Sequence, residues 1–140
     1  MAATTAGALK AYIESLGLGV PAFRRVAPPE HKVPPYITIQ DTLNLSADRS
    51  GDQGDPDARM TGSELVQVDL WESVHATDGS GERYGLPALL LRHLRNARLP
   101  IIGTSRVYGV VGVYVVHVPE PDPESELVHH AVTCTVRRAL

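Results

Sequence analysis

The chain has 140 residues, a net charge of −3 at pH 7 and a single cysteine. This length predicts one domain, which can form a core without metals or disulfides. One cysteine excludes a disulfide framework and a four-cysteine zinc site, and the slightly acidic balance is not typical of dedicated nucleic-acid-binding proteins. No apolar run is long enough to cross a membrane and no signal-peptide pattern opens the chain, so we expect a soluble intracellular domain.

Helical periodicity opens the chain. Leu9 and Ile13 belong to an apolar stripe at helical spacing, which predicts a helix at about residues 5–17. We expect a short strand over 20–26 and a clearer one over 36–43, where apolar and polar residues alternate. Prolines between these two strands predict an extended connection.

Residues 44–62 contain few apolar side chains and four aspartates, and glycine and proline interrupt any periodicity. We predict a long polar loop here. A loop of this length in a small domain is typically functional or disordered. The aspartates do not have the spacing of a helix–loop–helix calcium site, so we favour a solvated loop that orders on a partner.

The second half of the chain contains several strongly apolar elements. We predict strands over 63–73 and 127–138 and a helix over about 82–97, each with an apolar stripe. Pro87 indicates either that this helix begins at Leu86 or that it kinks there.

A further strand, expected over 106–118, is apolar on both of its faces. Strict alternation divides its side chains into two sets, Val107, Val111, Val113 and Val115 on one face and Tyr108, Val110, Tyr114 and Val116 on the other. A strand of this kind needs cover on both faces, so we expect a second protein surface against it.

The order helix, three strands, helix, two strands indicates the α+β class. We predict a single domain over residues 1–140, built on a mostly antiparallel sheet of about five strands with two helices.

No motif points to catalysis. The six histidines lack metal-ligand spacing, and the adjacent His129 and His130 point to opposite faces of a strand. Cys134 lies on the apolar face of the last strand, where a buried structural cysteine is the ordinary outcome. No nucleophile elbow, phosphate-binding loop or dinucleotide fingerprint is present. We therefore assign no catalytic residue, no cofactor and no metal site.

Two basic pairs, Arg24–Arg25 and Arg137–Arg138, have two interpretations. They can be charges that protect strand edges from aggregation. They can also pair with the acidic segments of a neighbouring subunit, around 48–57 or 120–126.

The layout of motifs suggests a family. A short amino-terminal helix precedes PPYITIQ (34–40) and a polar loop, and LVQVDLWES (65–73) leads into a leucine-rich helix and two closing strands that end in HHAVTCTVRR (129–138). Over nearly the whole chain this layout resembles the tail terminator (tail-completion) proteins of long-tailed phages. The resemblance implies helices packed on one face of the sheet and no enzymatic activity.

The same resemblance implies a structural virion protein of the tail or neck, assembled in the cytoplasm of the bacterial host. Such proteins form a ring, expected to be a hexamer, that caps the head-proximal end of the tail tube and ends its polymerisation. The implied partners are the tail tube protein and the head-closure protein. DNA would pass through the channel without specific binding, and an acidic channel would suit that passage.

These implications assign contacts with subunits, tube or head to charged and aromatic residues of the loop, the doubly apolar strand and the last strand. The candidates are Asp48, Arg49, Asp52, Asp55, Asp57, Arg59, Tyr108, Tyr114, Arg137 and Arg138. Two alternatives stay open, another neck or head–tail connector component and a small enzyme or ligand-binding domain. For the latter, the residues to test are His93, His117 and Cys134.

Overall fold

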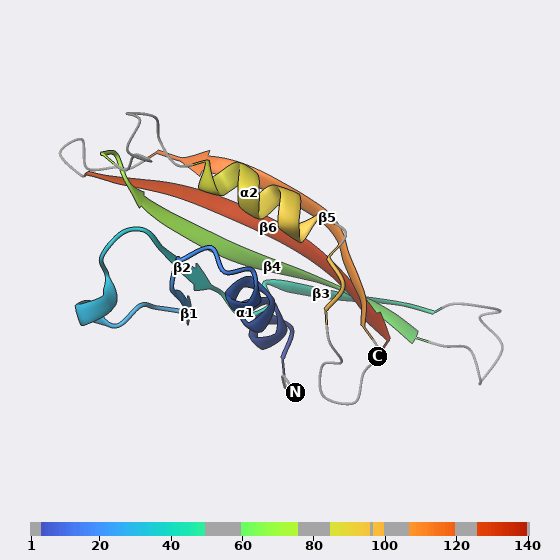
Figure 1. The fold of residues 1–140 in the computed structure, drawn as a ribbon. Coiled ribbons are helices and arrows are strands. Elements are labelled where there is room, and N and C mark those ends of the chain that lie inside the picture. The colour runs from blue at the N-terminus through green and yellow to red at the C-terminus, as the bar shows by residue number, and fades with distance from the viewer. Residues whose placement is uncertain are drawn as a thin grey trace.

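The computed structural model describes residues 4–49, 60–75, 85–95, 97–99, 107–119 and 126–139 (Figure 1). Its elements are α1 (Thr5–Ser15), β1 (Ala22–Arg24), a 3₁₀ turn (Pro29–His31), β2 (Tyr36–Ile39), β3 (Asn44–Arg49), β4 (Met60–Ser73), α2 (Leu86–Leu94), β5 (Val107–Val118) and β6 (Leu127–Ala139). The six strands form one sheet in the order β1-β2-β4-β6-β5, and β3 pairs with β4 beside β2. Among the described strands only β1 and β2 pair in parallel. The predicted α+β class is confirmed.

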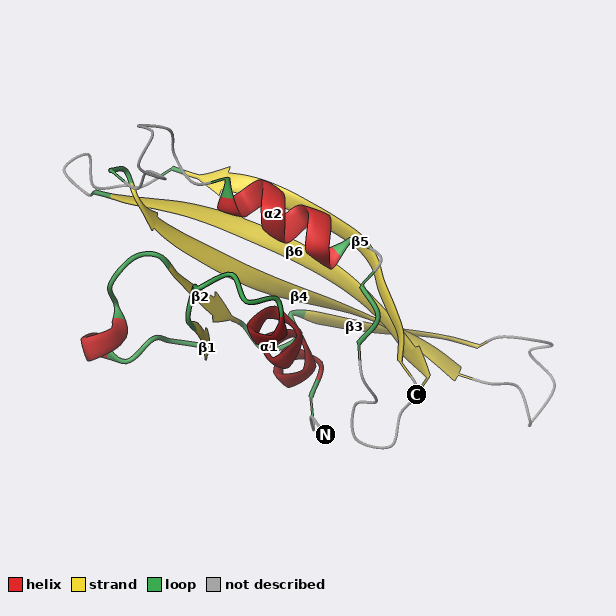
Figure 2. Cartoon of the chain, in the orientation of Figure 1, coloured by secondary structure: helices red, strands yellow, loops and turns green. Residues whose placement is uncertain are grey.

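Both helices lie on one face of this sheet (Figure 2), as the family resemblance implies. We call this the inner face and the opposite one the outer face. Helix α1 packs on β1, β2 and β4, whereas α2 packs on β5 and β6. The two helices therefore divide the inner face between them.

The first helix follows its prediction closely. The Thr4 hydroxyl caps α1 by accepting a hydrogen bond of 3.1 Å from the Gly7 N–H, which satisfies one of the free donors of the first turn. Leu9 and Ile13 are buried against the sheet. The helix ends before Gly17, whose φ of 65° is a left-handed conformation that glycine adopts readily.

The second helix is shorter than the predicted 82–97. It begins at Leu86 with Pro87 in its first turn, where the missing N–H of proline has no partner to lose. This answers the question raised by the proline, because a helix that starts here needs no kink. The helix ends at Leu94, and Arg95 already has an extended backbone.

The core lies between the helices and the inner face of the long strands. Val66, Val68 and Leu70 of β4 are fully buried, as are Leu90 and Leu94 of α2. The inner face of β6 is buried as its alternation predicts, through Val128, Val132, Cys134 and Val136. Truncating a buried leucine in such a core typically costs about 2–5 kcal/mol of stability.

The predicted loop over residues 44–62 is wrong at both of its ends. Residues Asn44–Arg49 form β3, which pairs antiparallel with β4, and β4 already begins at Met60. The alternation of NLSAD carries the strand signal, but its polar and small residues suit an edge strand with little buried surface. The preceding strand is also shorter than predicted, because β2 ends at Ile39 rather than at Leu43.

Strand β5 departs from strict alternation. Two irregularities in its pairing with β6, between Val107 and Gly109 and between Val110 and Gly112, shift the register. An extra residue in one strand reverses which side chains face the core. The expected grouping of Val111 with the core-facing valines is therefore wrong.

Instead, Val110 is buried and Val111 is exposed. The first irregularity requires glycine, because Gly109 has a φ of 125° and an added Cβ would lie 2.7 Å from the carbonyl oxygen of Ala97.

Candidate interaction surfaces

An aromatic row crosses one end of the outer face. Trp71 of β4 stacks on the ring of His129 of β6, with centroids 4.0 Å apart, and on Tyr36 of β2, with centroids 6.1 Å apart. The register explains the row, because Trp71 pairs with Tyr36 on one side and with His129 on the other. Side chains opposite one another in a sheet are close enough to stack.

Beside this row lies a buried carboxylate. Asp69 accepts hydrogen bonds from Gln67 Nε2 at 2.7 Å and Gln40 Nε2 at 3.1 Å, and its Oδ1 lies 2.7 Å from His129 Nε2. Strands β4 and β6 contribute to this network, together with Gln40, which directly follows β2. A buried carboxylate is costly unless such partners satisfy it, so these polar side chains take the place of a helix as cover for the middle of the outer face.

Three large apolar side chains on β5 are exposed. They are Val111 (55%), Tyr114 (55%) and Val116 (48%). Tyr114 was predicted as a contact residue, and its exposed position is compatible with that role. Tyr108 lies in β5, but its side chain is outside the described residues. The sequence predicts that both faces of this strand need cover, and these three side chains form an exposed apolar stripe among the described residues.

The predicted pair Arg137 and Arg138 splits between the two faces of β6. Arg137 pairs with Ser63 and is exposed, whereas the Arg138 guanidinium forms an ion pair with the buried carboxylate of Glu64. Thr42 donates a second hydrogen bond of 2.7 Å to Glu64. Burial raises the pKa of the Glu64 carboxyl, but hydrogen bonds such as those from Thr42 and Arg138 outweigh burial and hold the pKa below its usual value.

The remaining predicted contact residues belong to the aspartate-rich segment. Asp48 and Arg49 lie in β3, opposite Thr61 and Met60 of β4, and their side chains are outside the described residues. The other four, Asp52, Asp55, Asp57 and Arg59, lie wholly outside the described residues. Their assignment as contact residues stays a prediction.

The other basic pair is engaged within the chain. Arg24 and Arg25 each approach one oxygen of the Asp41 carboxylate, with nitrogen–oxygen distances of 2.6 Å. The hydrogen bonds from the two guanidinium groups hold the pKa of Asp41 below its usual value. This ion pair connects the end of β1 to the segment that follows β2.

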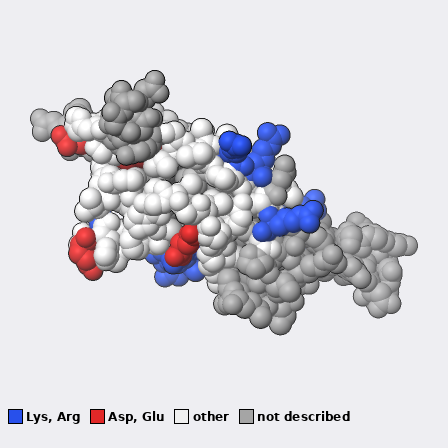
Figure 3. All heavy atoms as spheres, in the orientation of Figure 1, with Lys and Arg blue, Asp and Glu red and all other residues white. Residues whose placement is uncertain are grey.

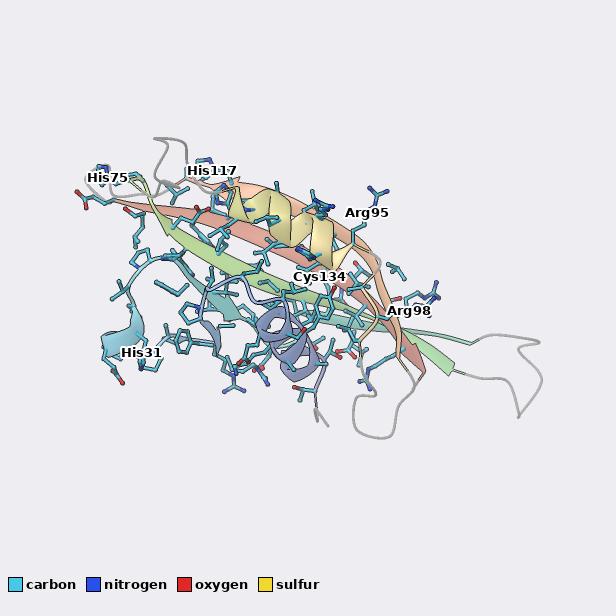
Figure 4. The ribbon with its side chains drawn as sticks, viewed as in Figure 1. His31, His75, Arg95, Arg98, His117 and Cys134 are labelled. Atoms are coloured by element: carbon cyan, nitrogen blue, oxygen red, sulfur yellow. The ribbon has the colours of Figure 1, made fainter. Side chains whose placement is uncertain are left out.

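Three other arginines are exposed at and beyond the carboxyl end of α2: Arg92, Arg95 and Arg98. Blue side chains gather at this end of the helix-bearing face (Figure 3), and Arg95 and Arg98 point away from the sheet (Figure 4). In the part of the chain that the structure describes, no carboxylate forms an ion pair with them. Cations at this position also interact favourably with the helix dipole.

One of the residues that an enzymatic function would use is buried. Cys134 is buried in the core beneath the helices (Figure 4), and burial raises the pKa of its thiol to about 12. His31 lies far from His75 and His117 in the same view. Among the described residues, no three histidine, cysteine, aspartate or glutamate side chains are grouped as metal ligands.

The two adjacent histidines point to opposite faces, as the alternation predicts. His129 contacts Asp69 on the outer face, and His130 Nδ1 lies 3.9 Å from Glu72 Oε1 on the inner face. The described helices include none that is long and apolar enough to cross a membrane.

The described surface also contains shallow cavities. One of about 280 Å³ lies between the α1–β1 connection and the start of α2, lined by Leu18, Gly19, Val20, Pro35 and Leu86. Another, of about 210 Å³, adjoins the aromatic row and includes Arg25, Lys32 and Trp71 among its lining residues. Neither set of lining residues includes His93, His117 or Cys134.

Comparison with solved structures shows a similarity in fold. No protein-family model matches this chain, and no curated protein matches it in sequence. A chain from a solved structure described as the virion of a native gene transfer agent (GTA) particle aligns with a TM-score of 0.55 and 14% sequence identity. The alignment covers 96% of this chain and 97% of that chain. The two chains share one fold.

Sequence reasoning missed the Asp69 network and the Glu64–Arg138 ion pair. In each case the carboxylate lies within an apolar strand, and it has a partner in β6 and another in the segment between β2 and β3. The available signal was the charge itself, because an acidic residue in a strand with this much apolar sequence requires a partner.

Proposed function

We propose that this chain is a structural protein of a phage-like virion. The observation that carries the proposal is the fold that it shares with a chain of the gene transfer agent virion. Because the alignment covers 96% of this chain and 97% of that chain, the likeness extends well beyond one common motif. Fold alone does not determine function, so the proposal also draws on the surfaces described above.

Within such a particle, we propose that the chain is a tail terminator. In this role, six copies of the chain form a ring on the head-proximal end of the tail tube. The ring ends tube polymerisation and contacts the head-closure protein, and DNA passes through its channel without specific binding. The apolar stripe of Val111, Tyr114 and Val116 supports an assembled state, because exposed apolar patches commonly mark protein–protein contacts. The proposed location is the tail or neck of the virion, after assembly in the host cytoplasm.

Another neck component is the second candidate, since the shared fold supports any small structural subunit of the particle. A connector would bind the head or its closure protein and leave tube growth unchanged. A terminator would bind one end of a tube and stop growth there.

The test combines mass, imaging and tube growth. A hexamer of the 15.1 kDa chain would have a mass of about 91 kDa and appear as rings in negative stain. Added during tube polymerisation, the protein should shorten the tubes in proportion to its concentration and label one end of each tube. Unchanged tube lengths with binding to heads would favour the connector. A monomer that binds neither tubes nor heads would overturn the virion role.

A further inference from the structure

One edge of strand β5 has no strand partner among the described residues. This strand is the last one of the sheet, and β6 is its only strand partner among the described residues. The Val110 N–H donates to the carbonyl of Ala97, which covers the first part of the edge that faces away from β6. From Gly112 to Val118, no described strand pairs with this edge. Its sequence, VYGVVGVYVVHV, contains no lysine, arginine, acidic residue or proline.

Natural proteins usually protect such edges with charge, proline or a covering segment, because free N–H and C=O groups recruit another strand. Among the described residues, the stretch Gly112–Val118 has none of these features, so it is a site where a strand from another molecule can add.

On the other side, the sheet ends at β1, which has only three residues, and at the longer strand β3. Strand β3 pairs with β4 alone among the described strands. Leu45, opposite the inner-face residue Glu64, is 53% exposed, and Leu43 just before the strand is 56% exposed. This edge has six residues, Asn44–Arg49, and the open part of β5, Gly112–Val118, has seven. The two edges therefore match in length.

We propose that β5 of one copy pairs with β3 of the next copy, so that the sheet continues from subunit to subunit around the ring. This inference rests on the proposed ring. Pairing between two different edges is heterologous and can close into a ring, whereas β5 pairing with another β5 would stop at a dimer. Heterologous pairing also brings the exposed apolar side chains at the β5 edge and at the β3 edge into the junction, while a β5 dimer would leave Leu43 and Leu45 uncovered.

The proposed junction continues the layers already present in the sheet. On the inner face, Val113 and Val115 of β5 pack against the core, and Leu45 of the next copy would lie beside them. On the outer face, Asn44 and Ser46 of the next copy would lie beside the exposed Tyr114. Successive side chains alternate between the faces, so a single register satisfies both sides.

The test uses pairs of cysteines introduced at the two edges. Tyr114→Cys and Ser46→Cys both lie on exposed outer-face positions of their strands, and a short bis-maleimide linker tolerates a shift of register by a residue or two. Val116→Cys with Asn44→Cys provides a second pair. The native Cys134 is buried, so the wild-type chain is the blank.

We expect the double-cysteine variants to give a ladder of covalent species that ends at the ring, whereas each single variant stays uncrosslinked. Covalent dimers of Tyr114→Cys alone would overturn the inference, because they require β5 to meet β5. Wild-type rings without a ladder from either pair would overturn it as well and leave the proposed ring intact. A wild-type chain that forms no ring, alone or on tubes, would overturn the ring and the inference together.

A charge at the edge provides an independent measurement. Val116→Lys should weaken self-association at least tenfold, since lysine on an edge opposes strand addition. Val33→Lys is the matched control, because Val33 is 70% exposed in the connection between β1 and β2, away from both edges. Both variants should melt as the wild-type chain does. Equal association of the two variants would contradict the proposed junction.

Discussion

The two faces of the sheet use the same strands in different ways. The inner face is apolar and covered by α1 and α2, with Val68, Leu70 and Val132 fully buried. The outer face has no described helix over it, and its centre is covered by the side-chain network around Asp69 and by the stacked rings of Trp71 and His129.

This difference separates stability from recognition. Apolar burial on the inner face supplies the main driving force for folding. The outer face buries fewer apolar side chains, and the β5 stripe on it is exposed. Substitutions on the inner face should therefore change mainly the free energy of unfolding, whereas substitutions at the β5 stripe should change mainly self-association.

The largest effect is expected on the inner face of α2. Leu90→Ala should lower the free energy of unfolding by about 2–5 kcal/mol, because it leaves a cavity in a fully packed core. The neighbouring Leu89→Ala is the matched control, since Leu89 is more than one-third exposed, and it should cost less than about 1 kcal/mol. Urea denaturation of both variants measures the difference. Similar losses for the two would place the helix in another orientation on the sheet.

The next effect concerns the charged pair at the edge of the inner face. Arg138→Met removes the cation that pairs with a buried carboxylate. The free energy of unfolding should fall by about 2–4 kcal/mol near neutral pH, because Glu64 is then left without its ionic partner. Glu64→Gln with Arg138→Met should recover part of that loss. Chemical denaturation of the single and double variants gives the coupling between the two residues.

The same carboxylate makes stability depend on pH. The pKa of Glu64 is lower in the folded chain than its usual value of 4.5, so its contribution is complete above that value. The contribution is lost as the pH falls through the folded-state pKa. Glu64→Gln should therefore flatten the acid limb of the stability profile, and an unchanged limb would assign acid sensitivity to other groups.

The inner face could be predicted from the sequence to a large extent. Period-two alternation identified the buried residues of β4 and β6, and helical periodicity identified most of those of α1 and α2, because burial on one face selects apolar residues at a fixed spacing. Helical periodicity also placed Leu89 in the core stripe of α2, which is wrong because Leu89 is 37% exposed. The same reasoning failed at β3, whose low apolar content resembles a loop, and at Val111, where irregular pairing reverses the alternation.

The outer face was less predictable because its order depends on partners distant in sequence. Asp69 and His129 are 60 residues apart in the chain, and only the register of β4 with β6 brings them together. Arg138 was assigned to an interface because it follows Arg137, but the alternation of β6 directs its side chain to the inner face. The contact residues Asp52, Asp55 and Asp57 remain predictions.

A smaller effect is expected for the outer-face network. Asp69→Asn keeps the shape of the side chain but converts one acceptor into a donor, which opposes the donating amides of Gln40 and Gln67. We expect the free energy of unfolding to fall by about 1–2 kcal/mol, since one buried polar group loses its hydrogen-bond partner. Thermal unfolding measures the loss, and Gln67→Leu on the same network should cost less than Asp69→Asn. A neutral Asp69→Asn would mean that the network covers the sheet without stabilising it.

The smallest effect on stability is expected at the β5 stripe, and it is the sharpest test of the comparison between the faces. Tyr114→Ala removes a large ring, but the side chain is 55% exposed in the isolated chain, so the free energy of unfolding should change by no more than about 0.5 kcal/mol. Self-association should nevertheless weaken, because the phenol ring of Tyr114 is buried only when a strand of another copy lies beside it. Unfolding is measured at a concentration where the wild-type chain is monomeric, and association by native mass at higher concentrations. A variant that lost stability and kept its association would show that Tyr114 supports the fold, and the outer face would then resemble the inner one in its role.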